Sequence, residues 1–234
     1  LPADRGAITD RSGVPLAVSV PQQSIFVDPA LIDDPRASAA LLAEVLGAEP
    51  EPIEARMRAD NRFGYVARHV PDDLAARVAD LELPGVAFVE EPKRFAPSGS
   101  LGSSIVGLVD TEGVGLSGIE EQFAELLEGT PGRLVFEQSP SGHTIPVGEH
   151  EVIPARKGHD VRLTVDRSLQ FEVERILGDT LQTHDAAGGI AVVTRPDTGE
   201  ILAMANMEHD REAGTVGPST NNGALTTVFE PGSV

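Results

Sequence analysis

Two short apolar segments near the C-terminal end constrain the fold more tightly than any other feature of this sequence. They cover residues 189–194 and 201–205, and the segment between them, Arg195-Pro196-Asp197-Thr198-Gly199-Glu200, carries proline and glycine where a reverse turn favours them. Apolar runs of this length on both sides of such a turn predict a β-hairpin whose strands are buried. An antiparallel sheet is therefore expected in this part of the chain.

Helical spacing of apolar residues predicts five helices elsewhere in the sequence. The first is expected to stop at Gly47, because glycine readily adopts the left-handed conformation that follows many helices. The last is expected to begin after Asp166, whose side chain suits an N-cap. The predicted helices cover residues 30–46, 52–59, 72–81, 116–128 and 166–182.

Strands and loops are predicted for most of the remaining chain. Strands are expected at residues 85–90 and 160–165 and within Arg133 to Pro154, the last stretch with turns at residues 140–142 and 147–149. Turns or loops are expected at residues 92–100 and 208–223, and residues 224–229 form a further apolar segment. The pattern predicts a mixed α+β fold, with a change of composition near residue 160 that suggests a domain boundary.

The charge and residue composition exclude several classes of function. Lysine and arginine total 18 against 37 aspartate and glutamate, a net charge of −19, so the surface repels the phosphate backbone and a nucleic-acid partner is not expected. The sequence contains no cysteine, which rules out disulfide scaffolds and thiolate sites. No run approaches the roughly 18 consecutive apolar residues that predict a membrane-spanning helix.

Most potential catalytic or ligand-binding groups have a simpler structural explanation. The six histidines are scattered without the i, i+4 spacing that would bring two imidazoles to one metal ion, so no metal site is predicted. The acid pairs at residues 33–34, 72–73 and 120–121 are expected to be solvated on polar helix faces. The glycine-rich segment 113–118 is expected to be a tight turn, and a glycosidase-type carboxylate pair stays a weak alternative.

The sequence ends on a potential nucleophile, in Glu230-Pro231-Gly232-Ser233. If Ser233 opens a helix, the free N–H groups and the positive end of the helix dipole there would favour the oxyanion of an acyl-transfer reaction. Serine is also a common helix N-cap, and from these four residues alone the N-cap is the more frequent explanation.

Six motifs in a fixed order resemble those of class B penicillin-binding proteins and cover nearly the whole chain. The first, which runs from Arg5 to Ala17, is similar to the R-G-x-I-x-D-R-x-G-x-x-L-A motif of that family. Two departures are Ser12, where the family often has asparagine, and Gly223, where it usually has arginine. The other five are Gly115 to Glu120 (G-x-x-G-I-E), Leu127 to Gly132 (L-x-G-x-x-G), Leu163 to Gln170 (L-T-V-D-x-x-L-Q), Thr198 to Ala205 (T-G-E-I-L-A-M-A), and Asn222 to Ala224 followed by Phe229 to Ser233 (F-E-P-G-S).

The resemblance implies two domains and an α+β architecture. Residues 1–157 are expected to form the pedestal, or dimerisation, domain of short helices and extended strands. Residues 158–234 are expected to form the N-terminal segment of a transpeptidase domain with a serine β-lactamase-like fold, truncated within the S-x-x-K motif. The resemblance also implies an extracytoplasmic location, anchored in the bacterial membrane by a helix that precedes this chain.

The same resemblance implies a peptidoglycan D,D-transpeptidase in which Ser233 is the nucleophile of S-x-x-K. The partners implied are peptidoglycan stem peptides, β-lactams, other cell-wall synthesis proteins and a possible second copy of the chain; no cofactor is implied. The lysine of the motif would stand at position 236, beyond the printed sequence, so the 234-residue chain is expected to be inactive by itself. A non-catalytic scaffolding module, and less favoured a β-lactamase or sensor, stay open as alternatives.

Overall fold

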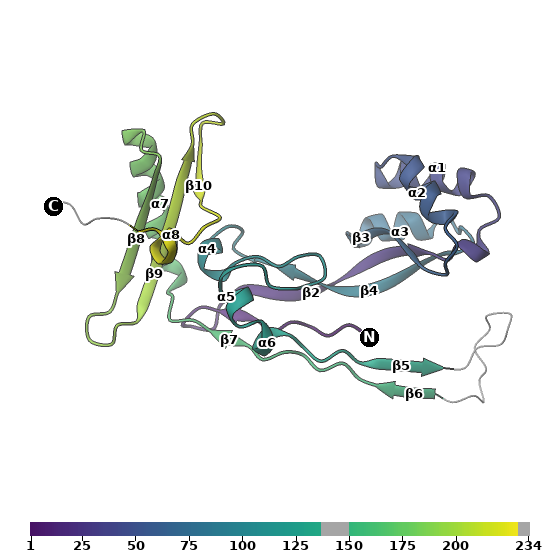
Figure 1. The fold of residues 1–234 in the computed structure, drawn as a ribbon, viewed down its shortest axis with the longest axis horizontal. Helices are drawn as coiled ribbons and strands as arrows, with labels where there is room; N and C mark the ends of the chain where they lie inside the picture. The colour runs from purple at the N-terminus through teal and green to yellow at the C-terminus, as the bar shows by residue number, and fades with distance from the viewer. Residues whose placement is uncertain (137–149, 229–234) are drawn as a thin grey trace. The chain divides into compact units, whose positions relative to one another are not determined.

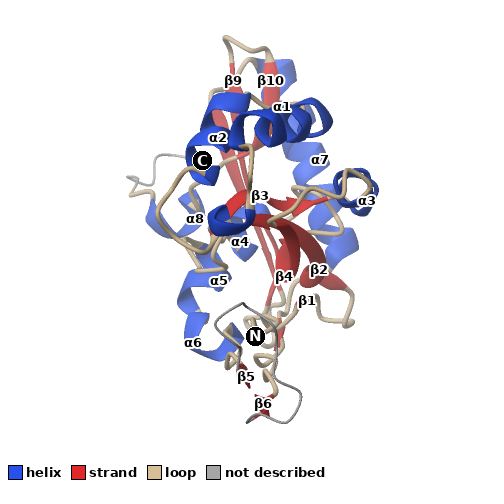
Figure 2. Cartoon of the chain, turned by 90° about the vertical axis from the view of Figure 1, so that its right-hand side faces the viewer, coloured by secondary structure: helices blue, strands red, loops and turns tan. Residues whose placement is uncertain are grey.

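The computed structural model describes residues 1–136 and 150–228, which divide into two compact units. Unit 1 comprises residues 1–19 and 94–234, and unit 2 comprises residues 20–93. Both units contain helices and strands, so the α+β prediction is confirmed (Figure 2). The divisions fall within two long strands, β2 (Pro15–Val27) and β4 (Val86–Phe95).

Unit 2 is a small sheet covered by three helices, α1 (Pro35–Leu46), α2 (Pro50–Met57) and α3 (Asp72–Ala79) (Figure 1). The strand β2 pairs with β4 and, antiparallel, with β3 (Gly64–Val70). A short 3-10 helix, η1 (Pro29–Leu31), precedes α1. The core of unit 2 is apolar and draws on all three helices; its fully buried members include Ile25, Val27, Ala39, Leu42, Met57 and Val78.

The first predicted helix begins later than its apolar pattern indicates. Asp34 caps α1 by accepting a hydrogen bond from the Ala37 amide, and Pro35 occupies the first turn, where proline needs no donor. Upstream, Asp28 caps the separate turn η1 in the same way. The end of α1 is as predicted, because Gly47 adopts φ +64° as its C-cap.

The first part of unit 1 is formed by segments that are distant in sequence. The short strand β1 (Ile8–Thr9) pairs antiparallel with the start of β2 and parallel with β7 (Val161–Arg162). A second core lies here, with Ile8 and Leu127 fully buried. The remaining elements of this part are α4 (Ser103–Val106), α5 (Gly118–Gln122), α6 (Ala124–Leu127) and the antiparallel ribbon β5 (Arg133–Phe136) with β6 (His150–Ile153).

The C-terminal part of unit 1 is a three-stranded antiparallel sheet covered on one face by a long helix (Figure 1). The helix α7 (Arg167–His184) begins after Asp166, whose carboxylate accepts hydrogen bonds from the Ser168 and Leu169 amides, as predicted. The predicted hairpin is confirmed as well. The sheet has the order β10 (Thr215–Pro218), β9 (Ile201–Asp210), β8 (Gly188–Thr194), and the short helix α8 (Gly223–Thr226) follows it.

Several sequence predictions are corrected by this structure. The single helix expected at residues 116–128 is two short helices, because Phe123 leaves the helical conformation with ψ +26° and φ −110°. The loop expected at 208–223 contains β10, which pairs with the far end of β9. The turn region expected from residue 92 begins only after β4 ends at Phe95. The turns expected at 140–142 and 147–149 lie outside the described residues.

The hairpin strands differ in burial, although both were expected to be buried. In β9, Ala203 and Ala205 are fully buried, but Ile190 and Val192 of β8 are each 46% exposed. The reason is that β8 is the last strand of the sheet in the described part of the chain, and α7 covers only one of its faces.

The described residues contain neither a helix suited to a membrane nor a cluster of metal ligands. Among the described helices, none is long and apolar enough to cross a bilayer. Within residues 1–136 and 150–228, no group of three or more histidine, aspartate or glutamate side chains is arranged to hold a metal ion.

Candidate functional site

The predicted nucleophile, Ser233, lies outside the described residues. The candidate site therefore consists of the elements that precede Ser233 in the chain. These elements are α7, the strand β9 and the helix α8, which ends at Thr226. Their side chains meet those of α4 and α5 in unit 1 around one cavity. Each contact described below lies within that unit.

Gln170 fastens α7 to the middle of β9. Its side chain is 1% exposed, and it donates to the Met204 carbonyl (2.9 Å) while accepting from the Met204 amide (2.8 Å). The strand β10 pairs with residues 207–210 of β9 and therefore does not reach Met204. The glutamine supplies the hydrogen bonds that a longer β10 would supply, because buried backbone groups must be paired.

Gln170 also connects this sheet to the segment that leads into α4. Its amide nitrogen donates to Glu174 Oε1 (2.7 Å), and the same oxygen accepts from the backbone N–H of Gly102 (2.9 Å), just before α4. Three segments of unit 1 are thus joined by one hydrogen-bond chain. Sequence reasoning gave Gln170 only as a motif position and did not find this role, since the pairing depends on where β10 ends.

Asn206 and Asn222 hold α8 against the sheet. Asn206 is 2% exposed; its Oδ1 accepts from the Ala224 amide (2.9 Å) and its Nδ2 donates to Asn222 Oδ1 (3.2 Å) and to Ser104 Oγ (3.4 Å). The side chain of Asn222 in turn donates to the Ser104 carbonyl (3.3 Å). The start of α8 is therefore held by an amide network that includes Ser104 of α4.

A cavity of about 540 Å³ lies between these elements. Most of its wall area is apolar, and its polar groups include Ser117 and Glu121 near α5, Thr164 before α7, and Asn222 at the start of α8. The apolar members are Ile105, Ile119, Leu163, Val165, Ile201, Met204 and Leu225. A partly enclosed apolar cavity with a few polar groups is the usual form of a small-molecule or peptide site.

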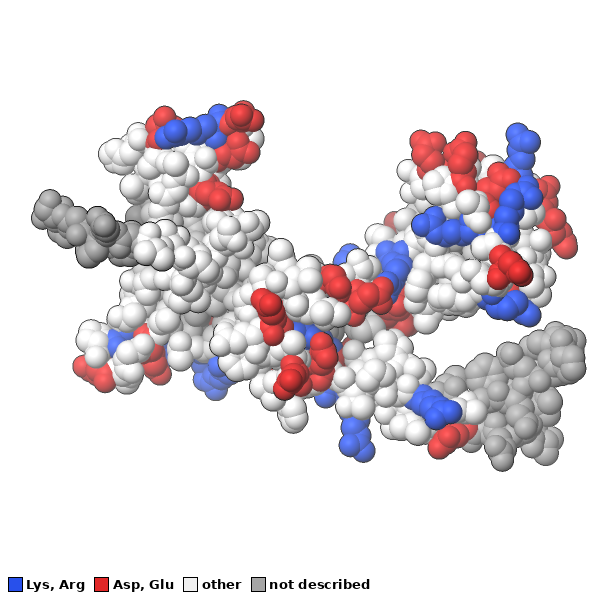
Figure 3. Space-filling view, in the orientation of Figure 1, with Lys and Arg blue, Asp and Glu red and all other residues white. Residues whose placement is uncertain are grey.

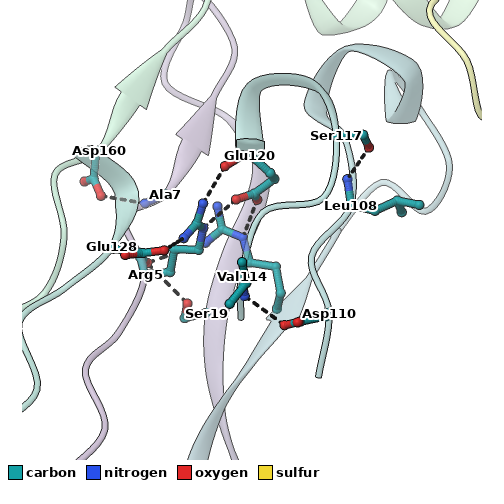
Figure 4. A network of polar contacts seen from close by, with 11 residues as sticks. Arg5, Ala7, Ser19, Leu108, Asp110, Val114, Ser117, Glu120, Glu128 and Asp160 are labelled. Carbon is teal, nitrogen blue, oxygen red and sulfur yellow. Dashed lines mark hydrogen bonds and ion pairs between the residues drawn. The ribbon is translucent and has the colours of Figure 1, made fainter. Parts of the chain in front are cut away.

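The backbone beside the cavity leaves no room for side chains at two glycines. A Cβ on Gly107 would lie 1.8 Å from the Ser117 carbonyl oxygen, and one on Gly118 would lie 2.6 Å from that of Ile105. Both glycines have positive φ, +89° and +60°. The close approach brings α4 and α5 together, and the Ser117 hydroxyl accepts a hydrogen bond from the Leu108 amide (Figure 4).

A buried charge cluster is centred on Glu120 of α5 (Figure 4). Glu120, 1% exposed, accepts hydrogen bonds from Arg5 Nε (2.6 Å) and from Arg94 Nε (2.7 Å), and the Glu120 carbonyl accepts one from Arg5. Burial lowers the pKa of Arg94, and Glu120 opposes that shift. The expectation that Glu120 is a solvated acid on a polar helix face is therefore wrong, because the helix α5 turns this residue toward two arginines.

The glycine-rich segment 113–118 is a tight turn, as expected. The Asp110 carboxylate accepts from the Glu112 and Val114 amides (2.9 Å each), and Gly113 has φ +82° (Figure 4). The first motif of the chain forms a similar turn, in which Asp10 accepts from the Ser12 and Val14 amides (2.8 Å each). Both segments are structural in the described chain.

Comparison with known proteins places two families along this chain. Residues 1–163 match the penicillin-binding protein dimerisation domain, and residues 189–234 match the penicillin-binding protein transpeptidase domain. The chain is 35% identical over 239 residues to the peptidoglycan D,D-transpeptidase FtsI of Escherichia coli (strain K12), covering 98% of this chain and 40% of the relative. It is 36% identical to the probable peptidoglycan D,D-transpeptidase PbpC of Pseudomonas aeruginosa, covering 100% of this chain and 42% of that protein.

Solved structures show the same architecture. A peptidoglycan synthetase from Bifidobacterium adolescentis is 31% identical with a TM-score of 0.63, covering 100% of this chain and 48% of that one. The penicillin-binding protein PBP2 of Helicobacter pylori, solved as a complex with MreC, shares the fold with a TM-score of 0.68 at 21% identity, covering 88% of this chain and 42% of that one. The chain thus spans about 40% of the length of the curated relatives it matches.

Proposed function

The chain belongs to the penicillin-binding proteins, and on that premise we propose that it is the pedestal and the first transpeptidase segment of a peptidoglycan D,D-transpeptidase. The observation that carries the proposal is the buried amide network of Asn206 and Asn222. This network fixes α8, which ends seven residues before Ser233. Acyl transfer requires the attacking hydroxyl to be held close to the scissile carbonyl, so the elements that precede Ser233 in the chain have to be positioned.

The proposed reaction proceeds through an acyl-enzyme on Ser233. The Ser233 oxygen attacks the penultimate D-Ala carbonyl of a stem peptide while its proton passes to a base, and the terminal D-Ala leaves as the amine takes up a proton. The amine of a neighbouring stem peptide then attacks the ester, forms the new amide and releases the serine. β-Lactams would acylate the same oxygen, because their strained amide resembles the D-Ala-D-Ala bond.

The 234 residues alone are expected not to acylate. A serine hydroxyl is a weak nucleophile unless a neighbouring base takes its proton. The S-x-x-K motif places that base three residues after Ser233, at position 236, which lies beyond the printed sequence. We therefore assign the chemistry to the whole protein and the positioning to this chain.

The domain boundary that we propose lies between residues 157 and 158. The dimerisation-domain match ends at residue 163 and the transpeptidase match begins at 189, so the helix α7 falls between them. Gln170 supports placing α7 with the transpeptidase segment, because its buried side chain binds β9.

We also propose partners and a location. The H. pylori relative was solved in complex with MreC, which supports cell-wall synthesis proteins as partners of this pedestal. A second copy of the chain is a further possible partner. The relatives are peptidoglycan transpeptidases, and on that basis the protein would work on the extracytoplasmic side of the bacterial membrane, held there by an anchor that precedes this chain.

Mass spectrometry after exposure to a labelled penicillin tests this function. The full-length protein should gain one covalent adduct on the peptide that contains Ser233, and the 234-residue chain should gain none. Full-length Ser233→Ala should also stay unlabelled while keeping its melting temperature. An unlabelled full-length protein that also leaves stem peptides unchanged would instead support the second candidate, a scaffolding module. That candidate is favoured by unit 2, which has its own core of buried residues and contributes none of the site described above.

A further inference from the structure

Asn222 and Gly223 form the only asparagine-glycine pair in the sequence, and no step of the proposed reaction uses either residue. The other three asparagines are each followed by a larger residue; they are Asn61, Asn206 and Asn221. Because glycine has no side chain, the backbone nitrogen that follows Asn222 is unshielded and its peptide unit rotates freely. A nucleophilic backbone nitrogen therefore stands next to a carboxamide at this one place in the chain.

The backbone at Asn222 forms a tight turn just before α8. Its φ of −81° and ψ of 82° are close to those of an inverse γ-turn, and the Gly223 amide donates to the Asn221 carbonyl (3.0 Å). In this turn the Gly223 N–H is directed at the carbonyl of residue 221. The helix α8 has only four residues, and a helix this short depends on its packing for stability. The folded turn thus restrains the Gly223 nitrogen only as long as α8 stays packed.

The carboxamide of Asn222 is held by contacts that are long for hydrogen bonds. Its Oδ1 accepts from Asn206 Nδ2 (3.2 Å), and its Nδ2 donates to the Ser104 carbonyl (3.3 Å) and to the sulfur of Met204 (3.4 Å). The two contacts with nitrogen and oxygen exceed the usual separation of about 2.9–3.0 Å. The side chain is half-buried, so water reaches this part of the chain. Local opening of α8 would release the carboxamide and the Gly223 nitrogen together.

We propose that Asn222 is a site of spontaneous deamidation, which proceeds when α8 opens locally. The Gly223 backbone nitrogen gives up its proton to the solvent and attacks Asn222 Cγ. The carboxamide nitrogen takes up a proton and leaves as ammonia, which closes a five-membered succinimide ring. Water then adds to either ring carbonyl, and the ring opens to aspartate or isoaspartate. One water molecule is consumed and one ammonia molecule is released, with no change of oxidation state.

The product would loosen the start of α8. A carboxylate at position 222 cannot donate to the Ser104 carbonyl, and its charge would repel that oxygen. Isoaspartate also inserts a methylene group into the backbone directly before α8. The added charge enters a chain with a net charge of −19, whose acidic side chains are visible on both units (Figure 3). The inference does not rest on acyl transfer at Ser233, because the modification needs only the residues around α8.

Peptide mass spectrometry of the 234-residue chain, aged at mildly alkaline pH, tests the proposal. The peptide that contains Asn222 should gain the mass difference between an amide and an acid with first-order kinetics. Fragment spectra should place the change on Asn222 and none on Asn221, and the peptides with Asn61 and Asn206 should stay unchanged. A synthetic peptide of residues 217–228 gives the rate without tertiary structure, and the folded chain should react about tenfold more slowly, because only the opened state reacts.

Three variants separate the chemistry from its control by the fold. Asn206→Ala removes the donor to Asn222 and should raise the rate by the same factor as amide exchange at Ala224, about tenfold, because both processes require the opening of α8. Gly223→Arg should slow the reaction strongly, both in the chain and in the synthetic peptide, where folding plays no part. Asn221→Ala keeps the backbone carbonyl of the turn and serves as the matched control, with an unchanged rate. Circular dichroism should show each variant folded.

Three results would overturn the proposal. The first is no conversion at Asn222 in the folded chain over a time about a hundredfold longer than the synthetic peptide needs. The second is a folded chain that reacts as fast as the peptide, which would mean that α8 does not control the reaction. The third is an unchanged rate in Asn206→Ala although amide exchange at Ala224 has become faster.

Discussion

The guanidinium of Arg5 and the carboxylate of Glu120, which are 115 residues apart in the chain, form a buried ion pair with 2.6 Å between Nε and Oε2 (Figure 4). Arg5 belongs to the first sequence motif and Glu120 to the G-x-x-G-I-E motif. One contact therefore joins two motifs, and their separation along the sequence does not reveal this contact. The second arginine, Arg94, binds the other carboxylate oxygen at 2.7 Å. Glu120 therefore links the start of the chain, through Arg5, and the end of β4, through Arg94, to the helix α5.

Replacing Glu120 should destabilise unit 1 strongly. Glu120→Gln leaves two buried guanidinium groups without their carboxylate, which we expect to cost about 3–5 kcal/mol in free energy of unfolding. The neighbouring control, Glu121→Gln, changes an exposed residue and should stay within about 0.5 kcal/mol of the parent chain. Arg94→Met should fall between them, because Arg5 and Glu120 remain paired. Urea unfolding of the four proteins measures the series, and similar losses for Glu120→Gln and Glu121→Gln would contradict it.

Acid should weaken unit 2 through Glu91. Burial alone would raise the pKa of this carboxyl, but hydrogen bonds from Arg68, Ser24 and Tyr65 outweigh it and lower the pKa from its ordinary value of 4.5. A lowered pKa in the folded state means that the stabilisation is fully present above about pH 4.5 and is lost as the pH falls through the folded value.

The pH dependence of unfolding in the parent chain and in Glu91→Gln checks this prediction. The stability difference between the two should be constant from pH 7 to about 5 and shrink on further acidification. Arg62 lowers the pKa of Asp28, and Lys157 lowers that of Asp160. Both carboxyl groups are present in the parent chain and in the variant, so their titration cancels in the stability difference. A difference that stays unchanged down to pH 3 would show that Glu91 carries no such linkage.

Asn206 should control the order of α8. Removing its side chain in Asn206→Ala deletes the acceptor for the Ala224 amide, so hydrogen exchange at Ala224 should become at least tenfold faster. Asn206→Asp keeps that acceptor but loses the donors to Asn222 and Ser104, and exchange at Ala224 should change less. Asn221→Ala, an exposed neighbour, serves as the control. Exchange that is equally fast in all three variants would argue against this network.

Two glycines with nearly the same φ allow the close packing of α4 and α5 to be measured. Gly107 has φ +89° and ψ −166°, a region almost confined to glycine, and Gly113 has φ +82°, so alanine is strained at both positions, by about 1–3 kcal/mol. Only at Gly107 would the new Cβ meet another atom, the Ser117 carbonyl oxygen at 1.8 Å, whereas Gly113 has nothing within 4 Å. Gly107→Ala should therefore lower the melting temperature clearly more than Gly113→Ala. Equal shifts would mean that α4 and α5 can separate at little cost.

Local rules in the sequence sufficed for many of the elements. The Asp166 cap, the Gly47 helix end and the turn at residues 195–200 each depend on a few neighbouring residues, and each is found where it was predicted. The wrong predictions concern elements whose pairing or burial depends on a segment that is distant in the sequence. The strand β10 forms because β9 extends far enough to pair with it, and one face of β8 is exposed because the helix α7 covers only the opposite face.

The order of motifs in the sequence was enough, by itself, to identify the penicillin-binding protein family, because each motif is a run of neighbouring residues that can be read without coordinates. Only the tertiary structure showed what the motif residues do for one another: Arg5 reaching Glu120, Gln170 bonding to Met204, and Asn206 holding Ala224. These pairs are separated by 115, 34 and 18 residues. Partners at such separations depend on the packing of the whole fold. A buried charge or amide needs a hydrogen-bond partner, and only the fold determines which complementary group lies within reach.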